Sequence, residues 1–250
     1  WRELRDLTPA ERYRRLVADA GLRRRLLAPR TEGGAPAFMG EAFHKMFPIA
    51  DRPDYEPDLA NSVAAIAERS GRTPQEVALE AILALGGKGL LMLPFENYAA
   101  GSLDVVHEMI TDPATVLGVA DGGAHVGVIC DASSPTSLLT LWGRDRTRGP
   151  RLGLEFLIAK QTRGTALSYG LADRGLLAPG HKADINIIDF GALCLKRPEV
   201  VYDLPAGGRR LIQRASGYRH TFVSGVETVR DDELTGERPG RLVRGAQTVM

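Results

Sequence analysis

The N-terminal third of the chain has apolar residues at helical spacing between clear start and stop signals. Thr8-Pro9-Ala10-Glu11 and Thr73-Pro74-Gln75-Glu76 are capping boxes, in which Thr caps the helix, Pro takes its first position and Glu bonds back to the cap. Gly21 and Gly71 follow apolar runs and are typical of helix ends. Similar spacing recurs further along, and the predicted helices lie at about 9–20, 22–27, 59–70, 74–85, 103–110, 137–142 and 152–162.

Two short apolar runs lack helical spacing. Leu90–Leu93 and Thr115–Ala120 are each about as long as a strand, and continuous apolar runs of this kind are typical of strands buried on both faces of a sheet. Strands that alternate with helices indicate an α/β fold with parallel pairing.

After residue 175 the pattern changes to short strands separated by Gly and Pro. Ala183–Ile188 alternates between apolar and polar positions, and Tyr218–Val223 and Val226–Arg230 flank Ser224-Gly225, a two-residue hairpin signal. We therefore predict two domains, residues 1–174 with the helices and buried strands, and residues 175–250 as a small β domain. Because only two buried strands precede residue 165, the chain cannot contain a complete eight-stranded barrel.

The composition is that of a globular protein. Hydrophobic residues make up 44% and charged residues 25% of the 250 residues, which argues against long disordered regions. No apolar run approaches the roughly 18 residues needed to span a bilayer, so we expect no membrane partner. The two cysteines cannot form a disulfide framework and suit a cytoplasmic location.

Charge is uneven along the chain although it sums to +1. Residues 1–30 carry a net charge of +5, residues 31–136 of −10 and residues 137–250 of +6. A basic opening segment could contact nucleic acid, but neither a nucleic-acid-binding motif nor interleaved aromatic residues accompany it. We therefore expect a solvated helix face and no nucleic-acid partner.

One local group of residues stands out as a candidate site. None of the five histidines forms a His-x-His or His-Glu-x-x-His pair, and phosphate-loop, dinucleotide and Gly-x-Ser-x-Gly motifs are missing. Asp121 directly follows a predicted buried strand, where α/β enzymes place their chemistry. Gly122 and Gly123 leave room for a ligand, and His125 can exchange protons near neutral pH. An ordinary turn capped by Asp121 fits the same residues, and the pattern alone does not decide.

A second polar cluster is predicted around Asp131 and Arg144-Asp145-Arg146. The planar guanidinium of an arginine suits a substrate carboxylate, which makes Arg146 a candidate for substrate binding. The alternative, an ion-pair network that fixes a loop, is the more common use of such a run.

Three stretches carry a family resemblance. They are residues 93–125, which end in the octapeptide GVADGGAH, residues 130–146, and residues 169–189, which contain the run APGHKADINIID. Together they resemble the amidohydrolase superfamily, and within it the N-acyl-D-amino-acid deacylase (D-aminoacylase) branch.

The resemblance implies a fold and a role for Asp121. Leu90–Leu93 and Thr115–Ala120 would be the last two strands of a (β/α)8 TIM-type barrel of a metal-dependent hydrolase, followed by an accessory β domain. Asp121 would act as general base and acid, which takes a proton from the water that attacks the amide carbonyl and passes it to the departing amine. The residues placed near the substrate are Gly122, Gly123, His125 and Arg146.

The metal ligands of this family have no counterpart in the sequence. Its first-strand His-x-His and its mid-barrel histidines are missing, so we expect this chain alone to hold no metal, with Asp121 at most a weak ligand. The resemblance implies zinc or another divalent metal, and a small-molecule substrate, for a longer protein of which this chain is the C-terminal portion. The N-terminal half of the barrel or a second copy of the chain would be its partner. A non-catalytic scaffold and a hydrolase of cyclic amides or lactones remain as alternatives.

Overall fold

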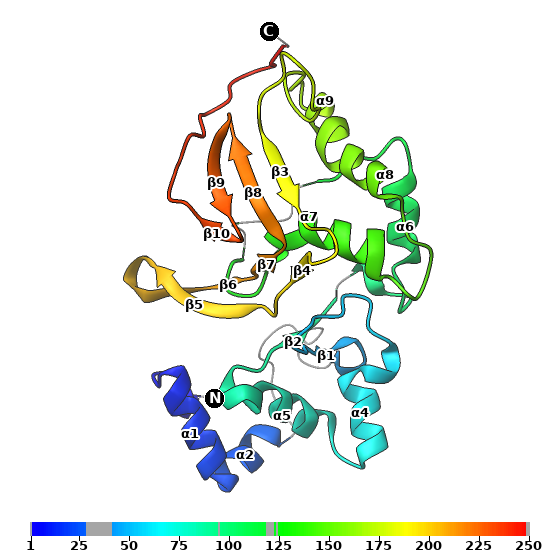
Figure 1. The fold of residues 1–250 in the computed structure, drawn as a ribbon. Helices are drawn as coiled ribbons and strands as arrows, with labels where there is room; N and C mark the ends of the chain where they lie inside the picture. The colour runs from blue at the N-terminus through cyan, green and yellow to red at the C-terminus, as the bar shows by residue number, and fades with distance from the viewer. Residues whose placement is uncertain (1, 29–41, 95, 119–122, 124, 249–250) are drawn as a thin grey trace. The chain divides into compact units, whose positions relative to one another are not determined.

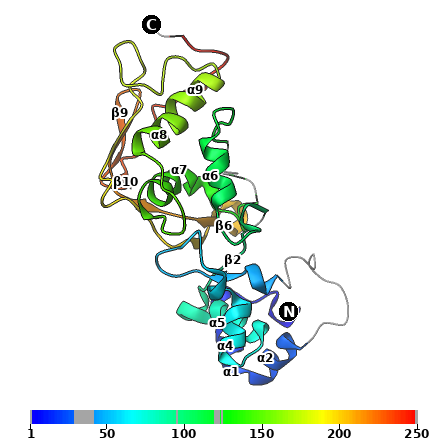
Figure 2. The same ribbon diagram turned by 90° about the vertical axis from the view of Figure 1, so that its right-hand side faces the viewer.

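The chain forms two units in the computed structural model, which describes residues 2–28, 42–94, 96–118, 123 and 125–248. Unit 1 comprises Trp1–Ala50 and Glu56–Gly101, and unit 2 comprises Asp51–Tyr55 and Ser102–Met250. Their helices and strands are labelled in Figures 1 and 2. None of the described helices combines the length and the apolar composition that crossing a membrane requires.

Unit 1 is built mainly from helices. Its α-helices are α1 (Pro9–Ala18), α2 (Ala20–Leu27), α4 (Val63–Ser70) and α5 (Pro74–Gly87). Its 3-10 helices, each one turn long, are η1 (Arg2–Leu4), η2 (Phe43–Lys45), η3 (Leu59–Asn61) and η4 (Glu96–Tyr98). The four helices predicted for this region are confirmed, but the prediction that Gly21 ends the first of them is wrong. Asp19 caps α2 by accepting a hydrogen bond from the N–H of Leu22, so Gly21 lies in the first turn of α2. α4 begins later than predicted because Ser62 caps it, its hydroxyl accepting a hydrogen bond from the N–H of Ala65.

Both predicted capping boxes form. The Thr8 hydroxyl accepts a hydrogen bond from the backbone N–H of Glu11, and the Glu11 carboxylate accepts one from the N–H of Thr8. Thr73 and Glu76 make the same pair of bonds at the start of α5. Each box satisfies backbone donors that the first turn of a helix leaves free. The last residues of α5 depart from helical geometry, and Leu85 takes a left-handed backbone conformation with φ of 54°.

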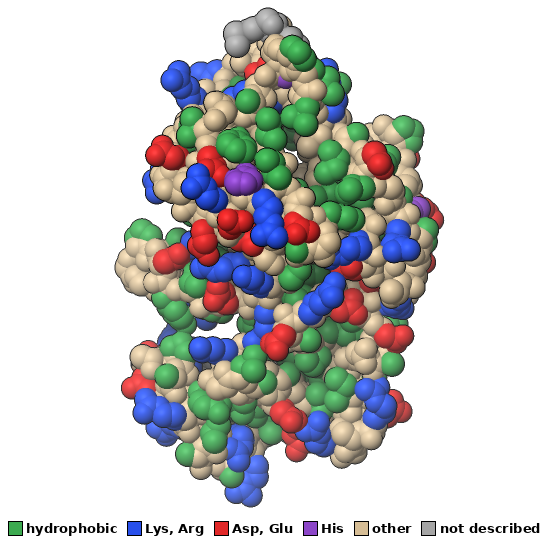
Figure 3. Space-filling view, viewed as in Figure 1, with side chains coloured by type: hydrophobic (Ala, Val, Ile, Leu, Met, Phe, Trp, Pro, Cys, Tyr) green, Lys and Arg blue, Asp and Glu red, His purple; other side chains and the backbone are tan. Residues whose placement is uncertain are grey.

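Small apolar clusters hold these helices together. Leu4, Leu16 and Leu22 form one cluster between η1, α1 and α2. The cluster between α4 and α5 contains Val63, Ala67, Val77 and Ala78. Over α1 and α2, Arg side chains lie at the surface (Figure 3), which is the solvated basic face that the charge pattern predicts.

The apolar run 90–93 forms a shorter strand than predicted. β2 (Leu91–Met92) pairs antiparallel with β1 (Phe47–Pro48), with Phe47 opposite Met92, and both residues of β2 are only half-buried. The prediction of a parallel strand buried on both faces is therefore wrong. Such a strand needs a partner on each side, and in the described part of the chain β1 alone pairs with β2.

The helical half of unit 2 consists of three helical segments. Its helices are α6 (Asp104–Thr111), η5 (Asp131–Ser133), α7 (Ser134–Ser137), η6 (Leu138–Asp145), α8 (Leu154–Ala159), η7 (Lys160–Gly164) and α9 (Thr165–Ser168). η6 and η7 are π-helical, and each directly continues the α-helix before it. The three predicted helices of this region are confirmed, and the last two are longer than predicted.

The strand half of unit 2 is antiparallel. A four-stranded sheet has the order β10-β9-β8-β3, and β4-β7 and β5-β6 form two-stranded sheets. The strands are β3 (Ile185–Ile188), β4 (Cys194–Leu195), β5 (Glu199–Leu204), β6 (Gly208–Ile212), β7 (Ala215–Ser216), β8 (Tyr218–Val223), β9 (Val226–Arg230) and β10 (Glu233–Leu234). η8 (Pro205–Gly207) joins β5 to β6. The predicted turn at Ser224 and Gly225 is left-handed at both residues, with φ of 52° and 80°, as a type I′ hairpin requires.

The second predicted parallel strand is wrong as far as the structure describes it. Residues 115–118 have no strand pairing, and Val116 is 49% exposed. The strand pairs of the described residues are antiparallel, apart from an isolated parallel bridge between Leu171 and Gln247. A parallel strand pairs with a second strand that a long crossover connection places beside it. In the described part of the chain no strand pairs with residues 115–118.

Helices and strands of unit 2 share one core. α8 and α9 lie on the β3 side of the four-stranded sheet (Figures 1 and 2). The buried core residues are Ile110, Leu138, Leu139, Trp142, Leu157 and Leu193. The change from helices to strands falls between α9 and β3. The division into domains 1–174 and 175–250 stays a prediction.

Leu157 is expected to be a sensitive position of this core, because it is fully buried. Leu157→Ala should lower the free energy of unfolding by about 2–5 kcal/mol through lost burial and the cavity it leaves. Leu177, which is 77% exposed, is the matched control, and Leu177→Ala should change it by less than about 0.5 kcal/mol. Urea titration of both variants measures the difference, and equal effects would contradict this assignment.

A cross-strand carboxylate makes stability depend on pH. Glu227 accepts hydrogen bonds from Arg230 and lies 2.6 Å from Nδ1 of His220. These contacts, Arg230 first, lower the pKa of Glu227 from 4.5 to about 2. Because this pKa is lowered, the ionised group stabilises the fold above its ordinary pKa and loses that effect as the pH falls toward 2.

Glu227→Gln should therefore lower the melting temperature at pH 6–7, and the gap to the wild type should close between about pH 5 and pH 2. Thermal unfolding followed by circular dichroism across this range measures it. Glu237→Gln, at an exposed position, serves as control. A gap that stayed constant down to pH 2 would contradict the assigned contacts.

Candidate active-site segment and polar network

The predicted catalytic segment is described only in part. Asp121 and Gly122 lie outside the described residues, so the orientation of the carboxylate stays a prediction. Gly123 and His125 are described, and both are exposed. Leu117, which precedes the segment, packs against the core of unit 2 and so anchors one end of it.

Left-handed backbone shapes the described part of this segment. φ is 105° at Gly123 and 45° at His125. The first value is one that glycine alone adopts readily, and the second is uncommon for a residue with a Cβ. The His125 carbonyl accepts hydrogen bonds from the N–H groups of Val128 (2.9 Å) and Ile129 (3.1 Å), which closes a tight turn. The backbone conformation at position 123 therefore favours glycine, independently of the space that a ligand would need.

A strand from the distant part of unit 2 runs beside this turn. The backbone N–H of Leu211 in β6 donates to the carbonyl of Val126 at 2.7 Å. A Cβ on Gly127 would lie 3.8 Å from Nε of Arg209, also in β6. The hydrogen bond from β6 thus stabilises the turn in addition to the turn's own hydrogen bonds.

Arg146, the predicted substrate-binding arginine, is engaged inside the protein. Its side chain is fully buried, and its Nη2 donates to Oδ1 of Asp104 at 2.6 Å. Its Nη1 donates to the carbonyl of Pro150 at 3.1 Å, and its guanidinium lies 4.7 Å from the ring centroid of Trp142. The pKa of Asp104 is lowered, first by the hydrogen bond from Arg146. These contacts join α6 to the end of η6. They are the contacts expected of the alternative interpretation, in which an ion-pair network fixes a loop. Substrate binding by Arg146 stays a prediction.

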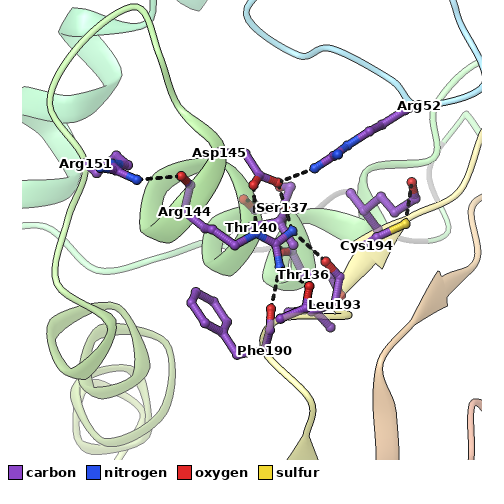
Figure 4. A network of polar contacts seen from close by, with 12 residues as sticks. Arg52, Thr136, Ser137, Thr140, Arg144, Asp145, Arg151, Phe190, Leu193 and Cys194 are labelled. Carbon is purple, nitrogen blue, oxygen red and sulfur yellow. Dashed lines mark hydrogen bonds and ion pairs between the residues drawn. The ribbon is translucent and has the colours of Figure 1, made fainter.

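Arg144 forms the centre of a polar network (Figure 4). Its Nε and Nη2 donate to the two carboxylate oxygens of Asp145 at 2.7 and 2.9 Å. Nη2 also donates to the carbonyl of Leu193 at 2.7 Å, and Nη1 donates to the carbonyl of Phe190. Because both carbonyls lie between β3 and β4, this side chain ties η6 to the strand half of unit 2.

Asp145 is the shared acceptor of two arginines. Besides Arg144, Arg52 reaches it through Nη2 at 2.9 Å (Figure 4). Both arginines keep the pKa of Asp145 below its usual value, the hydrogen bond from Arg144 having the largest effect. The network therefore also holds the segment 51–55.

A cavity of about 530 Å³ lies beside this network. Its polar lining includes Tyr55 and Thr140, and Cys194 also lines it. Burial raises the pKa of Tyr55 to about 12, so its hydroxyl stays protonated at neutral pH.

Burial, followed by the charge of Asp131, also raises the pKa of Cys130, as expected for an inert thiol.

A larger cavity of about 1080 Å³ opens between α8, η7 and β3. Leu117 and Gly118, the last described residues before the Asp121 segment, line it together with apolar side chains such as Ile158 and Ile185. Gln161 also lines it, and its Oε1 is buried with no hydrogen-bond partner among the described residues.

Three residues of this region were not predicted from the sequence. Arg52 and Tyr55 lie in a stretch that the glycines and prolines mark as a loop, and Gln213 carries no motif. Arg52 contacts a residue 93 positions away, and Tyr55 contacts Gln213 across 158 positions. No local pattern records such distant partners.

The described residues do not fit a catalytic metal. No group of three or more His, Cys, Asp or Glu side chains that could hold an ion occurs among them.

Comparison with known families decides where the chain belongs. The profile described as "Amidohydrolase family" matches residues 60–229, well over half of the chain and inclusive of Asp121, Arg144 and Asp145. The chain belongs to the amidohydrolase family. The resemblance predicted from the three sequence stretches is thereby confirmed.

Two curated relatives come from Alcaligenes xylosoxydans xylosoxydans. The chain is 32% identical to an N-acyl-D-glutamate deacylase over 108 residues, 43% of this chain and 20% of the relative. It is 28% identical to a D-aminoacylase over 186 residues, 70% of this chain and 34% of the relative. The chain of this amidohydrolase thus spans about a third of the length of one of these relatives and a fifth of the other.

Two solved structures are also similar. One is a D-aminoacylase mutant in complex with CuCl2, with a TM-score of 0.41 and 21% identity, covering 78% of this chain and 37% of that one. Another D-aminoacylase structure, which concerns a binuclear metal centre, has a TM-score of 0.39 and 21% identity and covers 76% of this chain and 36% of that one.

The two arginines that reach Asp145 should differ in importance. Arg144→Lys keeps the charge but loses the paired bonds to Asp145 and a bond to a backbone carbonyl, which should cost about 1.5–3 kcal/mol of the free energy of unfolding. Arg52 is 72% exposed, so Arg52→Lys should cost less than about 1 kcal/mol. Denaturant titration compares them. An equal or larger loss for Arg52→Lys would contradict the central role of Arg144.

Proposed function

We propose that this amidohydrolase hydrolyses the amide C–N bond of N-acyl-D-amino acids and that Asp121 is its general base and acid. The observation that carries the proposal is the family match over residues 60–229, which includes Asp121. The names of the two curated relatives, which deacylate N-acyl-D-glutamate and D-amino-acid derivatives, support the substrate class.

Asp121 performs a proton transfer in this proposal. Its carboxylate takes a proton from the water that attacks the amide carbonyl and delivers it to the nitrogen of the departing amine, so that a carboxylic acid and a free amine are produced. Gly122, Gly123 and His125 line the substrate beside it. The exposed position of Gly123 and His125 supports this placement, since a substrate can reach them.

The fold and the metal belong to the same proposal. We propose residues 1–174 as a helical segment and the last part of a (β/α)8 barrel, and residues 175–250 as its accessory β domain. A divalent metal, zinc or another, is proposed for the whole protein because a D-aminoacylase has a binuclear metal centre. The described residues lack a ligand cluster, so the ligands would come from the N-terminal half of the barrel or from a second copy of the chain. The proton transfer by Asp121 is proposed independently of the metal's identity.

Replacement of Asp121 tests the function directly. In the whole protein, Asp121→Asn should lower kcat for N-acetyl-D-glutamate or N-acetyl-D-leucine by about 10²–10⁴-fold, because the general base and acid is lost. The melting temperature should change little. Glu108→Gln, an exposed carboxylate on α6, is the matched control and should keep wild-type turnover. Amine release, followed with D- and L-substrates, is the measurement.

Two results would overturn the proposal. Near-normal turnover by Asp121→Asn would remove its catalytic role. A metal-loaded wild-type protein that released no amine from D-substrates would instead favour the scaffold or the cyclic-amide and lactone alternatives.

A further inference from the structure

One face of the continuous helix formed by α8 and η7 is open at the surface of unit 2. Glu155, Ala159 and Thr162 on this face are exposed, and Ile158 is 37% exposed. Together with Arg163 they border the cavity of about 1080 Å³ beside β3, and we refer to these five residues as the α8–η7 face. The side chains at its centre, Ala159 and Thr162, are small, so a second helix can pack closely against it.

The two ends of this face carry opposite charges that lack counter-charges. Glu155 at one end has neither a hydrogen-bond nor an ion-pair partner among the described residues. Arg163 at the other end donates through Nη1 to the carbonyls of Ala172 and Arg174 at 3.0 and 3.2 Å, and no described carboxylate pairs with it. Eight positions separate the two residues, about 12 Å along a helix, so they cannot pair with each other.

A second copy of the chain would supply both missing partners at once. When two copies of a helix pack antiparallel about a twofold axis, residues equally far before and after the axis face each other. Ala159 lies four positions from Glu155 and four from Arg163. An axis at Ala159 therefore places Glu155 of each copy opposite Arg163 of the other.

The surroundings of the face also favour a copy of the same chain. Leu176, which is 48% exposed, borders the same cavity as Ile158 and adds to the apolar surface between the two charges. A further charged residue of the cavity lining, Asp184, is already paired with Lys182 at 3.1 Å. An acidic or a basic partner would satisfy only one end of the face, whereas a second copy satisfies both.

We propose that the α8–η7 face is a homodimer interface, in which two copies pack antiparallel about a twofold axis near Ala159. The contacts are apolar at the centre and end in two identical Glu155–Arg163 ion pairs. The interface makes no use of the Asp121 segment, so this inference does not depend on the proposed function.

Size-exclusion chromatography with light scattering, run on the whole protein over a dilution series, tests the interface. The wild type should have the mass of a dimer. Glu155→Arg and Arg163→Glu should each raise the dissociation constant of the dimer at least about tenfold, because each replaces two attractive contacts by two repulsive ones. An equimolar mixture of the two variants should form a heterodimer, in which both contacts are again attractive.

Ala159→Arg keeps the proposal testable if Arg163→Glu folds poorly. Because Ala159 is exposed, the fold of one copy accommodates an arginine there, but two arginines would meet at the twofold axis. This variant should be monomeric with an unchanged circular dichroism spectrum. Ala10→Arg, at an exposed alanine of α1, is the matched control and should remain dimeric.

Three results would overturn the proposal. They are a monomeric wild type, a dimer that persists in Ala159→Arg, and a mixture of the two charge variants that forms no heterodimer. With a monomeric wild type, an Ala159→Cys thiol that resists alkylation would show that another part of a longer protein covers the face instead.

Discussion

The guanidinium of Arg144 joins the helical and the stranded halves of unit 2. It holds the carboxylate of Asp145 with two donors and binds two backbone carbonyls between β3 and β4 with the others. A guanidinium stays charged at every pH at which the protein is folded, so this link does not depend on the state of a titratable donor. Because Arg144 fixes the Asp145 carboxylate, a second arginine, Arg52, can bind the same group. The segment 51–55 thereby joins unit 2, although its neighbours in sequence belong to unit 1.

The segment 51–55 is held at both ends by different chemistry. Arg52 binds Asp145 through an ion pair at the surface, where salt and solvent weaken it. Tyr55 at the other end is half-buried and bonded to the neutral amide of Gln213. The same amide also accepts a hydrogen bond from the hydroxyl of Ser133.

Local signals predicted those parts of the fold whose partners are close in sequence. The capping boxes at Thr8 and Thr73 and the Ser224-Gly225 turn are complete within a few residues, and the structure contains them as predicted. The apolar composition of residues 90–93 and 115–118 indicates only that these side chains favour burial. Whether such a run becomes a parallel strand depends on neighbours that the pattern does not contain, which is why the first prediction was wrong and the described part of the second forms no strand pair. The family resemblance was confirmed because its motifs lie together in the sequence, whereas the contacts of Gln213 cross 80 and 158 positions.

The half-buried amide of Gln213 shows how contacts between distant residues can fix a side chain in one arrangement. Its oxygen has Ser133 as a donor, and its two N–H groups have Lys196 and Tyr55 as acceptors. With Lys196 alone, one N–H would be left without a partner at a half-buried position, at an energetic cost that a small rotation could relieve. Tyr55 removes that freedom, so the amide, and with it Ser133, has one favoured arrangement. Tyr55 lies outside the residues matched by the family profile, while Ser133, Lys196 and Gln213 lie within them. A residue that precedes the family-matched part of the chain thus completes the hydrogen bonding of a side chain within it.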